Sequence, residues 1–555
     1  MSEFINKNKN IVYIVLLVLL SVLFLFVGLG SFPLIDVDET RYATMARDML
    51  LTGNWNDLML NGVPFLEKPP LYFWLVALSV KFFGNFTPFA VRFPIALMSF
   101  VLVMLTYFLG KKVISEKFGF YSATVLLASF LFLMLSHIAI LDSLLMVFIA
   151  FALYSGFMVT ICSKNMQKWF WLAFYLSVGI GVLAKGILAV GIPCVILFIY
   201  FVITKNLKLL LHPIHLIGIL LFFAIVTPWH YLMHKNYGGY FWIEYFVRHH
   251  FARFLNSETI GRERPFLYFV PVFLAGFMPW TLLSFDLFVD GVKKGYNKIK
   301  SGFVLNNDAE RLVFFSALSF CFIFLLFSVA STKLPTYILP SFPFISILMG
   351  YYWYRADEYR EHEKPLRVLT LALAFVFVLL SVVGSVVCLF LPAEYLSYIE
   401  KIQVLVLLGF ALCGMLLTLR AYGHRIMSLF ATYLIIMLFI TMTTVTRVTN
   451  ILYMSGENEL VNYSSISATL PKSKLITFDF PVKPSIKVNY TDDADFITDM
   501  NFTKLDVLLE FYRDNNVFVI VKNKNIKNNS GYAEMLDKRL NLLHKGYKYS
   551  LYVKP

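Results

Sequence analysis

The feature that most constrains this chain is a series of apolar runs, each long enough to cross a lipid bilayer, that recurs as far as about residue 446. Hydrophobic residues make up 59% of the chain and the mean hydropathy is +0.71, well above the values of soluble domains. A β-barrel would instead show short segments of alternating polarity. The chain is therefore predicted to be a mainly α, polytopic membrane protein.

We expect about thirteen transmembrane spans. The first follows two lysines and is too long for the apolar region of a signal peptide, so we expect it to be an uncleaved span. The expected spans are 11–30, 89–110, 118–136, 140–161, 169–184, 186–203, 213–231, 266–288, 312–331, 336–353, 367–391, 402–419 and 427–446. Residues 1–448 are thus predicted to form one transmembrane helix bundle.

The distribution of basic residues predicts the orientation of these spans. If the N-terminus is cytoplasmic, every basic loop falls on the cytoplasmic side, in agreement with the positive-inside rule. These loops hold Lys111, Lys112, Lys117, Lys164, Lys168, Lys205, Lys208, Lys293, Lys294, Lys298, Lys300, Arg355, Arg360, Lys364, Arg367, Arg420 and Arg425. The net charge of +14 therefore indicates membrane lipids, not nucleic acid, as partners. An odd number of spans places the C-terminus outside.

The exterior side receives two long loops and the C-terminal region. The loops are 31–88 and 229–265, and within the first the apolar residues of 39–50 recur at helical spacing, which predicts an interfacial helix. Residues 449–555 are polar and contain strand-like and helix-like segments, at 476–480, 504–514, 517–522 and 547–554. This alternation predicts a small C-terminal α/β domain, which would be periplasmic in a Gram-negative cell.

Charged residues in the first exterior loop form one group of candidates. Asp38 either caps the interfacial helix or places a carboxylate at the lip of an active site, with Arg41 and Tyr42 as further candidates beside it. Glu67 and Lys68 lie in "FLEKPPLYFW", where Pro-Pro imposes an extended backbone. Either the two form a surface ion pair worth about 0–1 kcal/mol, or Glu67 binds a metal or a sugar and Lys68 binds a phosphate.

A second group lies at the outer ends of later spans. Asp142 begins an apolar run, where it is either an N-cap or a functional carboxylate, because charges at membrane depth are costly. Lys185 lies in the same outer layer and either marks a turn or belongs to the site. In "STKLPTYILPSFP", Lys333 could extend to the interface and Tyr337 could belong to the aromatic belt, or both could meet a ligand.

The segment "EYFVRHHFARF" carries a cationic cluster that includes His249, His250 and Arg253. It is either an interfacial helix that touches lipid headgroups or part of the site, with one histidine as a metal ligand. All these charged residues, although distant in sequence, map to the same face of the membrane. The sequence therefore predicts a cationic site for a lipid-borne anion at the outer rim of the bilayer.

The stretch 36–74, together with "RERPFLYFVPVFLAGFMPW" (262–280) and 331–343, resembles the aminoarabinose transferase family. These are membrane glycosyltransferases of the GT-C class, related to protein O-mannosyltransferases. The resemblance implies a GT-C helix bundle that moves an amino sugar from undecaprenyl phosphate to a phosphate of lipid A. The product would lower the negative charge of the cell surface and give resistance to cationic antimicrobial peptides. It also implies the inner membrane of a bacterium as the location.

The same resemblance assigns roles to the acidic residues. Asp38 and Asp142 match the essential carboxylates of the family. Glu67 matches its metal-binding glutamate, and His250 is carried over as a second metal ligand, with His249 as the alternative one residue away. The metal would be a divalent ion such as Zn or Mg with a structural role. No nucleotide cofactor is expected.

Basic residues and a tyrosine would bind the phosphate of the donor. By motif match, Lys68 and Arg253 contact the carrier phosphate and Tyr337 lies close to it, with Lys333 beside them. Phe65 departs from the family pattern, in which a tyrosine is common at this position. That change would remove one polar contact to the carrier.

Three questions stay open at the level of the sequence. The sugar could be aminoarabinose or a hexosamine such as galactosamine, because both enzymes could share every motif quoted. The acceptor could be a protein, as in O-mannosyltransferases, for which Asp38 would serve as the base. A lipid transporter is a rival from another class, but it should show charges at the bilayer midplane and related halves. We expect a monomer.

Overall fold

The computed structural model describes most of the chain up to residue 390 and parts of the remainder. The described residues are 9–32, 34–35, 38–60, 62–252, 264–390, 409, 426–427, 429–431, 433–435, 437, 460, 463–464, 466–467, 473–478, 480, 495–497, 502–528, 530–546 and 548–555. The chain forms two compact units. The first comprises Met1–Val27, Phe65–Tyr72 and Arg92–Thr443, and the second comprises Gly28–Pro64, Phe73–Val91 and Thr444–Pro555. The last junction lies close to the predicted domain boundary at 448/449.

Helices occupy the positions of the predicted spans throughout the first 390 residues. They are α2 (Lys9–Leu25), α5 (Pro88–Val113), α6 (Glu116–Leu127), α7 (Phe130–Ser136), α8 (Leu141–Ile161), α9 (Lys164–Lys185), α10 (Leu188–Ile203), α11 (Ile214–Trp242), α13 (Phe269–Gly276), α14 (Thr281–Lys300), α15 (Asp308–Val329), α16 (Phe342–Tyr359) and α17 (Glu363–Phe390). The predicted spans 402–419 and 427–446 lie almost entirely outside the described residues. The mainly helical fold class is confirmed.

Among the described residues, four helices are long and apolar enough to cross a membrane, or six if two bent pairs each count as one span. The bent pairs are α6 with α7, at 66°, and α13 with α14, at 119°. The predicted single spans 118–136 and 266–288 are therefore broken. The second break contains Pro279, which has no N–H to donate to a continuous helix. The total of thirteen spans stays a prediction.

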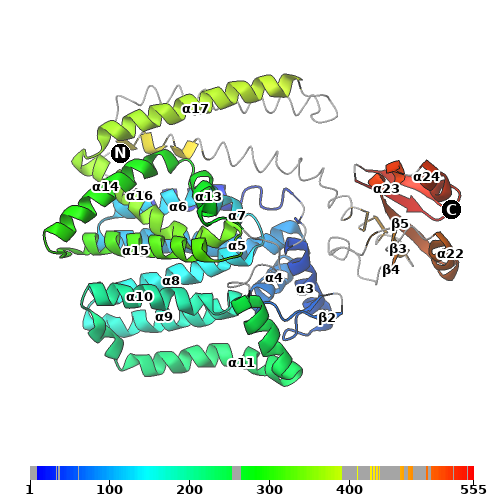
Figure 1. The fold of residues 1–555 in the computed structure, drawn as a ribbon, viewed down its shortest axis with the longest axis horizontal. Coiled ribbons are helices and arrows are strands. Elements are labelled where there is room, and N and C mark those ends of the chain that lie inside the picture. Colours follow the sequence, from blue (N-terminus) through cyan, green and yellow to red (C-terminus); the bar gives the residue numbers. More distant parts are fainter. Residues whose placement is uncertain are drawn as a thin grey trace. The chain divides into compact units, whose positions relative to one another are not determined.

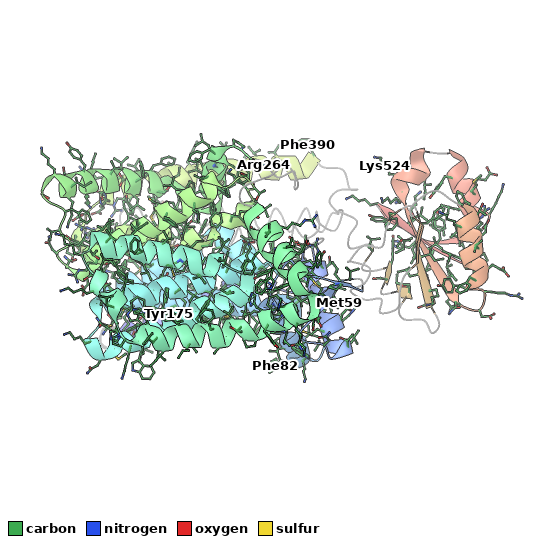
Figure 2. All side chains as sticks on the ribbon, turned by 60° about the horizontal axis from the view of Figure 1, so that its bottom comes forward. Met59, Phe82, Tyr175, Arg264, Phe390 and Lys524 are labelled. Carbon is green, nitrogen blue, oxygen red and sulfur yellow. The ribbon has the colours of Figure 1, made fainter. Side chains whose placement is uncertain are left out.

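Helix α8 forms the centre of the first unit and packs against α9, α10 and η4 (Pro335–Ser341). Almost all of its residues are buried, so it meets protein on every side. Figure 1 shows α8 to α11 lying alongside one another. Tyr175 of α9, which Figure 2 labels, has its hydroxyl 3.0 Å from Nδ1 of His215 in α11. At Gly350 of α16, a Cβ would lie 2.6 Å from the Cα of Ser122, so the crossing with α6 requires glycine.

In the second unit, the N-terminal part contains α3 (Asp38–Thr52), the hairpin of β1 (Met59–Leu60) with β2 (Val63–Pro64), and most of α4 (Leu71–Phe83). The helix predicted at 39–50 is confirmed as α3, and its apolar face is buried. Tyr42 packs edge-on against Phe73, with 5.5 Å between ring centroids. The indole N–H of Trp74 donates to the carbonyl of Trp55 at 2.7 Å, which ties α4 to the loop after α3.

The C-terminal part of the second unit contains a five-stranded mixed sheet in the order β4-β3-β5-β7-β6. Strands β3 (Ser473–Phe478), β5 (Asn516–Lys522) and β7 (Tyr549–Val553) and helix α22 (Phe502–Phe511) confirm the predicted segments. Both edge strands, β4 (Asp495–Ile497) and β6 (Asn541–Lys545), were absent from the prediction. Strand β4 has only three residues, and β6 is exposed throughout and has no alternation of polarity.

Candidate functional site

Three residues predicted from the sequence come together at one end of the helix bundle: Asp142, Lys185 and Tyr337. Lys185 Nζ forms an ion pair with Asp142 Oδ1. The same ammonium lies 5.1 Å from the ring centroid of Tyr337, within the range of a cation–π contact. The three side chains come from α8, α9 and η4, so the cluster joins segments that are almost 200 residues apart in sequence.

The ends of two helices explain why Asp142 and Lys185 meet. Asp142 lies in the first turn of α8, after Ile140 in an extended conformation, and Lys185 is the last residue of α9. Gly186 ends α9 with φ of 98°, a conformation that glycine adopts without steric cost. A carboxylate at a helix N-terminus and an ammonium at a C-terminus each complement the helix dipole. The two charges are therefore placed by local helix chemistry and then paired by packing.

Burial makes this pair a strong constraint on the structure. The side chains of Lys185 and Asp142 are only 15% and 12% exposed. Removing two charges from water costs several kcal/mol each, and their attraction compensates for this cost only if both partners are present. The pair thus holds a positive charge in a fixed place, beside an aromatic ring and shielded from water.

Lys333 lies four residues before Tyr337 and is buried, with 5% of its surface exposed. Its ammonium donates hydrogen bonds to the carbonyl oxygens of Arg264, at 3.0 Å, and Ala330. Burial lowers the pKa of Lys333 from its usual value of 10.5. The interpretation in which this lysine extends to the membrane interface is wrong, because its head group is turned inward onto backbone carbonyls.

Glu67 and Lys68 lie in the non-helical segment between β2 and α4, as the two prolines predict. Both side chains are half-buried, and Pro69 and Pro70 are buried. The segment Phe65–Tyr72 belongs to the first unit, as do Asp142, Lys185 and Tyr337.

Asp38 begins α3 in the second unit and is exposed, while Tyr42 is buried in that unit. Tyr42 therefore packs in a core, and Arg41 is half-buried. The neighbouring Glu39, absent from the predicted site, accepts a hydrogen bond from the backbone N–H of Ile35 at 2.8 Å and is itself buried. Asp38 is the first residue of α3, and Glu39 ties this helix to the segment before it. The signal that could have identified Glu39 was its position beside Asp38 at the start of a predicted helix, where either carboxylate could accept backbone hydrogen bonds.

The predicted cationic segment forms η2 (Ile243–Ala252), a π-helix that follows α11. Arg248 contacts Glu244 at 3.3 Å, as their helical spacing predicts. The side chains of His249 and His250, and all of Arg253, lie outside the described part of the chain.

A metal at Glu67 and His250 therefore stays a prediction. Within the described ranges, no three His, Cys, Asp or Glu residues gather closely enough to hold a metal ion. That finding does not bear on a site that includes His250, because its side chain is not among those described.

Sequence reasoning missed a buried arginine in the same unit. Arg92 is fully buried near the start of α5, close enough to His137 to influence it electrostatically. His137 lies just after α7, where its Nδ1 contacts the carbonyl of Leu133 at 3.0 Å. An arginine within an apolar run was the signal that could have identified this pair.

Comparison with known proteins identifies similar sequences and a similar fold. A family described as dolichyl-phosphate-mannose-protein mannosyltransferase matches residues 67–232. An Edwardsiella ictaluri protein named undecaprenyl phosphate-alpha-4-amino-4-deoxy-L-arabinose arabinosyl transferase is 30% identical over 63% of this chain and 61% of its own length. A protein of the same name from Wigglesworthia glossinidia brevipalpis is 28% identical over 62% and 59%. The chain spans about three fifths of the length of the curated relatives it matches.

Among solved structures, ArnT from Cupriavidus metallidurans bound to undecaprenyl phosphate matches over 98% of both chains, with a TM-score of 0.77 and 18% identity. Its apo state matches over 98% of this chain and 97% of its own, with a TM-score of 0.74. The fold is therefore the polytopic helical fold of ArnT. In sequence, the chain is similar to proteins named as aminoarabinose transferases, in agreement with the resemblance of its motifs.

Proposed function

We propose that this protein is a glycosyltransferase that moves an amino sugar from undecaprenyl phosphate to a phosphate of lipid A. The observation that carries the proposal is the sequence similarity to relatives named as aminoarabinose transferases. The shared fold and the buried charged cluster at one end of the bundle support it. Aminoarabinose is the sugar that these names favour, and a hexosamine is the alternative.

In the proposed reaction, a phosphate oxygen of lipid A attacks the anomeric carbon of the sugar. The bond from that carbon to the carrier phosphate breaks, and its electron pair leaves with the phosphate. No proton has to move, because the attacking phosphate is already anionic, so direct displacement with inversion needs no general base. Lys68 and Arg253 would stabilise the charge that grows on the leaving phosphate, and Asp38 would orient the sugar.

The ion pair with Lys185 supports a positioning role for Asp142. The residue could have paired with the ammonium of the sugar, but Lys185 already pairs with it. Asp142 would then act by holding Lys185 beside Tyr337, and the donor phosphate would approach that fixed ammonium. Lys333 would add a second cation from the same segment as Tyr337. A divalent metal at Glu67 and His250 would shape the loop without taking part in the displacement.

We place the enzyme in the bacterial inner membrane, with a cytoplasmic N-terminus and a periplasmic active site and C-terminal domain. Labelling of single cysteines introduced at Asn54 and Lys164 from each side of the membrane tests this orientation. Asn54 should react from the periplasm and Lys164 from the cytoplasm. The reverse pattern would contradict the orientation.

Mass spectrometry of lipid A from cells with and without the gene tests the proposed reaction. Wild type should add the mass of a pentosamine, or of a hexosamine if the alternative sugar is correct. Lys68→Ala should abolish the addition, whereas the matched control Lys81→Ala, an exposed lysine at the end of α4, should keep it. The cells should lose resistance to cationic antimicrobial peptides together with the modification. Unmodified lipid A alongside a glycosylated membrane protein would favour the protein acceptor that the matching family's description suggests.

A further inference from the structure

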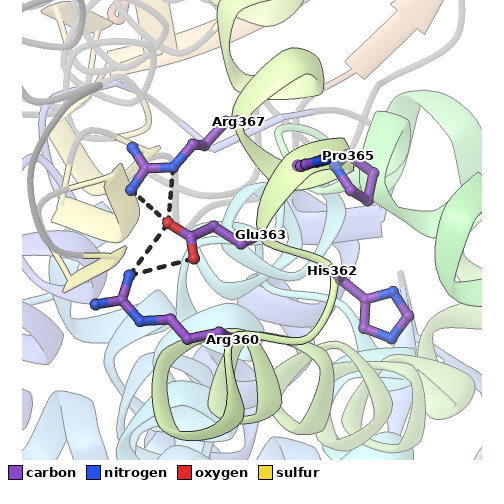
Figure 3. Close-up of a pocket in the computed structure, with 6 residues that line it drawn as sticks. Arg360, His362, Glu363, Pro365 and Arg367 are labelled. Atoms are coloured by element: carbon purple, nitrogen blue, oxygen red, sulfur yellow. Dashed lines mark hydrogen bonds and ion pairs between the residues drawn. The ribbon is translucent and has the colours of Figure 1, made fainter.

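A basic pocket lies at the turn between α16 and α17, away from the cluster around Asp142. It has a volume of about 550 Å³ and is lined by Arg360, His362, Glu363, Lys364, Pro365 and Arg367. Figure 3 shows the guanidinium groups of Arg360 and Arg367 directed at the carboxylate of Glu363. Helix α16 has 18 residues, so the pocket is about 27 Å along this helix from η4, which carries Tyr337. The pocket is therefore at the opposite end of the bundle from the proposed active site.

The pocket keeps a positive charge after its internal contacts are counted. Its lining holds three permanent cations, Arg360, Lys364 and Arg367, against the single carboxylate of Glu363. Glu363 accepts hydrogen bonds from Arg360 at 3.1 Å and from Arg367 at 2.7 Å, which fixes both guanidinium groups in place. Lys364 is exposed and makes no ion pair with any described residue. The arrangement suits an anion, because the fixed cations are oriented before the anion arrives.

The turn that carries these cations is held by α14. Arg360 and His362 both have φ of 59°, a left-handed conformation that costs non-glycine residues about 1 kcal/mol or more each. The two ring nitrogens of His362 face Asp286 at 3.2 Å and Asp290 at 3.5 Å. The imidazole also packs on Tyr352, with 4.8 Å between ring centroids. The contacts with Asp286 and Asp290 of α14, together with the packing on Tyr352 of α16, keep the turn in its strained shape.

An exposed apolar face of α17 begins next to the pocket. Its members recur at helical spacing along the helix as far as Phe390, which Figure 2 labels at the end of α17. Among the described side chains of α17, the exposed large apolar residues are Val368, Phe375, Leu379, Val382, Val383, Val386 and Phe390. A cationic pocket followed by an apolar helix face has the two halves of an amphiphile-binding site.

We propose that this pocket binds the phosphate headgroup of an anionic phospholipid, whose acyl chains lie along α17. The occupant is a lipid of the surrounding bilayer on the predicted cytoplasmic side, distinct from the donor and acceptor of the proposed reaction. Charge complementarity selects an anionic headgroup over a zwitterionic one, because the latter brings no net negative charge. A free phosphate shares the headgroup chemistry but would leave the apolar face of α17 without a role.

Native mass spectrometry of the purified full-length protein, titrated with phosphatidylglycerol, tests this proposal. The double variant Arg360→Gln/Lys364→Gln removes two exposed cations, and its affinity for phosphatidylglycerol should fall roughly tenfold to thirtyfold. The control Lys164→Gln/Lys208→Gln removes two exposed lysines from the same predicted side and should change the affinity less than threefold. Phosphatidylcholine should bind the wild type as weakly as phosphatidylglycerol binds the Arg360/Lys364 variant.

Three results would overturn the proposal. Equal affinity for phosphatidylglycerol and phosphatidylcholine would remove the headgroup preference. An equal loss of affinity in both double variants would show a diffuse surface effect. Inorganic phosphate that displaces phosphatidylglycerol completely at millimolar concentration would assign the pocket to a soluble anion. None of these results depends on sugar transfer, so they stand apart from the test of the proposed function.

Discussion

The buried pair of Asp142 and Lys185 gives the sharpest test of how this bundle is held together. Replacing Lys185 by methionine keeps the length of the side chain and removes its charge, which leaves Asp142 buried beside an apolar neighbour. Replacing Asp142 by asparagine removes the negative charge and leaves the ammonium of Lys185 buried without its charged partner. Each single variant should therefore be less stable than the wild type, and the double variant should recover part of the loss.

The magnitude follows from the burial of the two side chains. Breaking a fully buried ion pair costs about 3–5 kcal/mol. Because 12% of the Asp142 side chain and 15% of the Lys185 side chain stay exposed, water partly screens the charge that remains in each variant. We expect each single variant to lose about 2–4 kcal/mol of unfolding free energy, with a coupling of about 2 kcal/mol between them.

Equilibrium unfolding in mixed detergent micelles, followed by tryptophan fluorescence, measures these differences. Lys164→Met, at the other end of α9, is the matched control and should change stability by less than about 0.5 kcal/mol. If the losses of the two single variants simply add in the double variant, the pair does not contribute as a pair. Sugar transfer should stay low in the double variant even where its stability returns, because the positioned ammonium is missing.

Three further predictions concern other parts of the site and the bundle. Glu39→Ala should lower stability by about 1–3 kcal/mol through the lost hydrogen bond to Ile35, whereas Asp38→Ala should leave unfolding unchanged and reduce transfer. Gly350→Val should cost about 1–3 kcal/mol or more, because its side chain would clash with Ser122, and Gly350→Ala should cost less. Transfer that relies on the charge of Lys333 should fall as pH rises, at a pH below 10.5, because burial lowers its pKa. In the same pH window the folded chain binds fewer protons than the unfolded chain, so Lys333 should make the free energy of unfolding rise with pH. Lys333→Arg should remove the pH dependence of transfer and that of stability. A pH profile that this variant leaves unchanged would contradict the assignment.

The helices of the first unit were predictable because each apolar run has the length that a bilayer demands. The breaks within two of these runs were not predictable from hydropathy, because the packing of neighbouring helices and the position of Pro279 decide them. The same limit explains the missed edge strands of the C-terminal sheet. Strand β6 is exposed on both faces and pairs only through its backbone with β7, so its side chains carry no pattern.

The cluster of Asp142, Lys185 and Tyr337 was partly predictable. Asp142, Lys185 and Tyr337 were chosen because charges and aromatics at the ends of apolar runs must meet water, a ligand or each other. The sequence could not show that Lys185 pairs with Asp142, because that contact depends on how α8 and α9 pack. It also could not separate Glu39 from Asp38, since only the backbone geometry decides which carboxylate reaches the N–H of Ile35.

The bend between α13 and α14 bears on which side of the membrane every later segment faces. If the chain turned back at this bend, every later segment would change sides, and the basic residues at 355–367 and 420–425 would face outward. The lysines that end α14 would then face outward as well, against the positive-inside rule. Lys298, near the end of α14, pairs with Glu310, near the start of α15. The positive-inside rule therefore predicts that the bent pair is one crossing, and Pro279 lies at the point on which the sidedness of the second half depends.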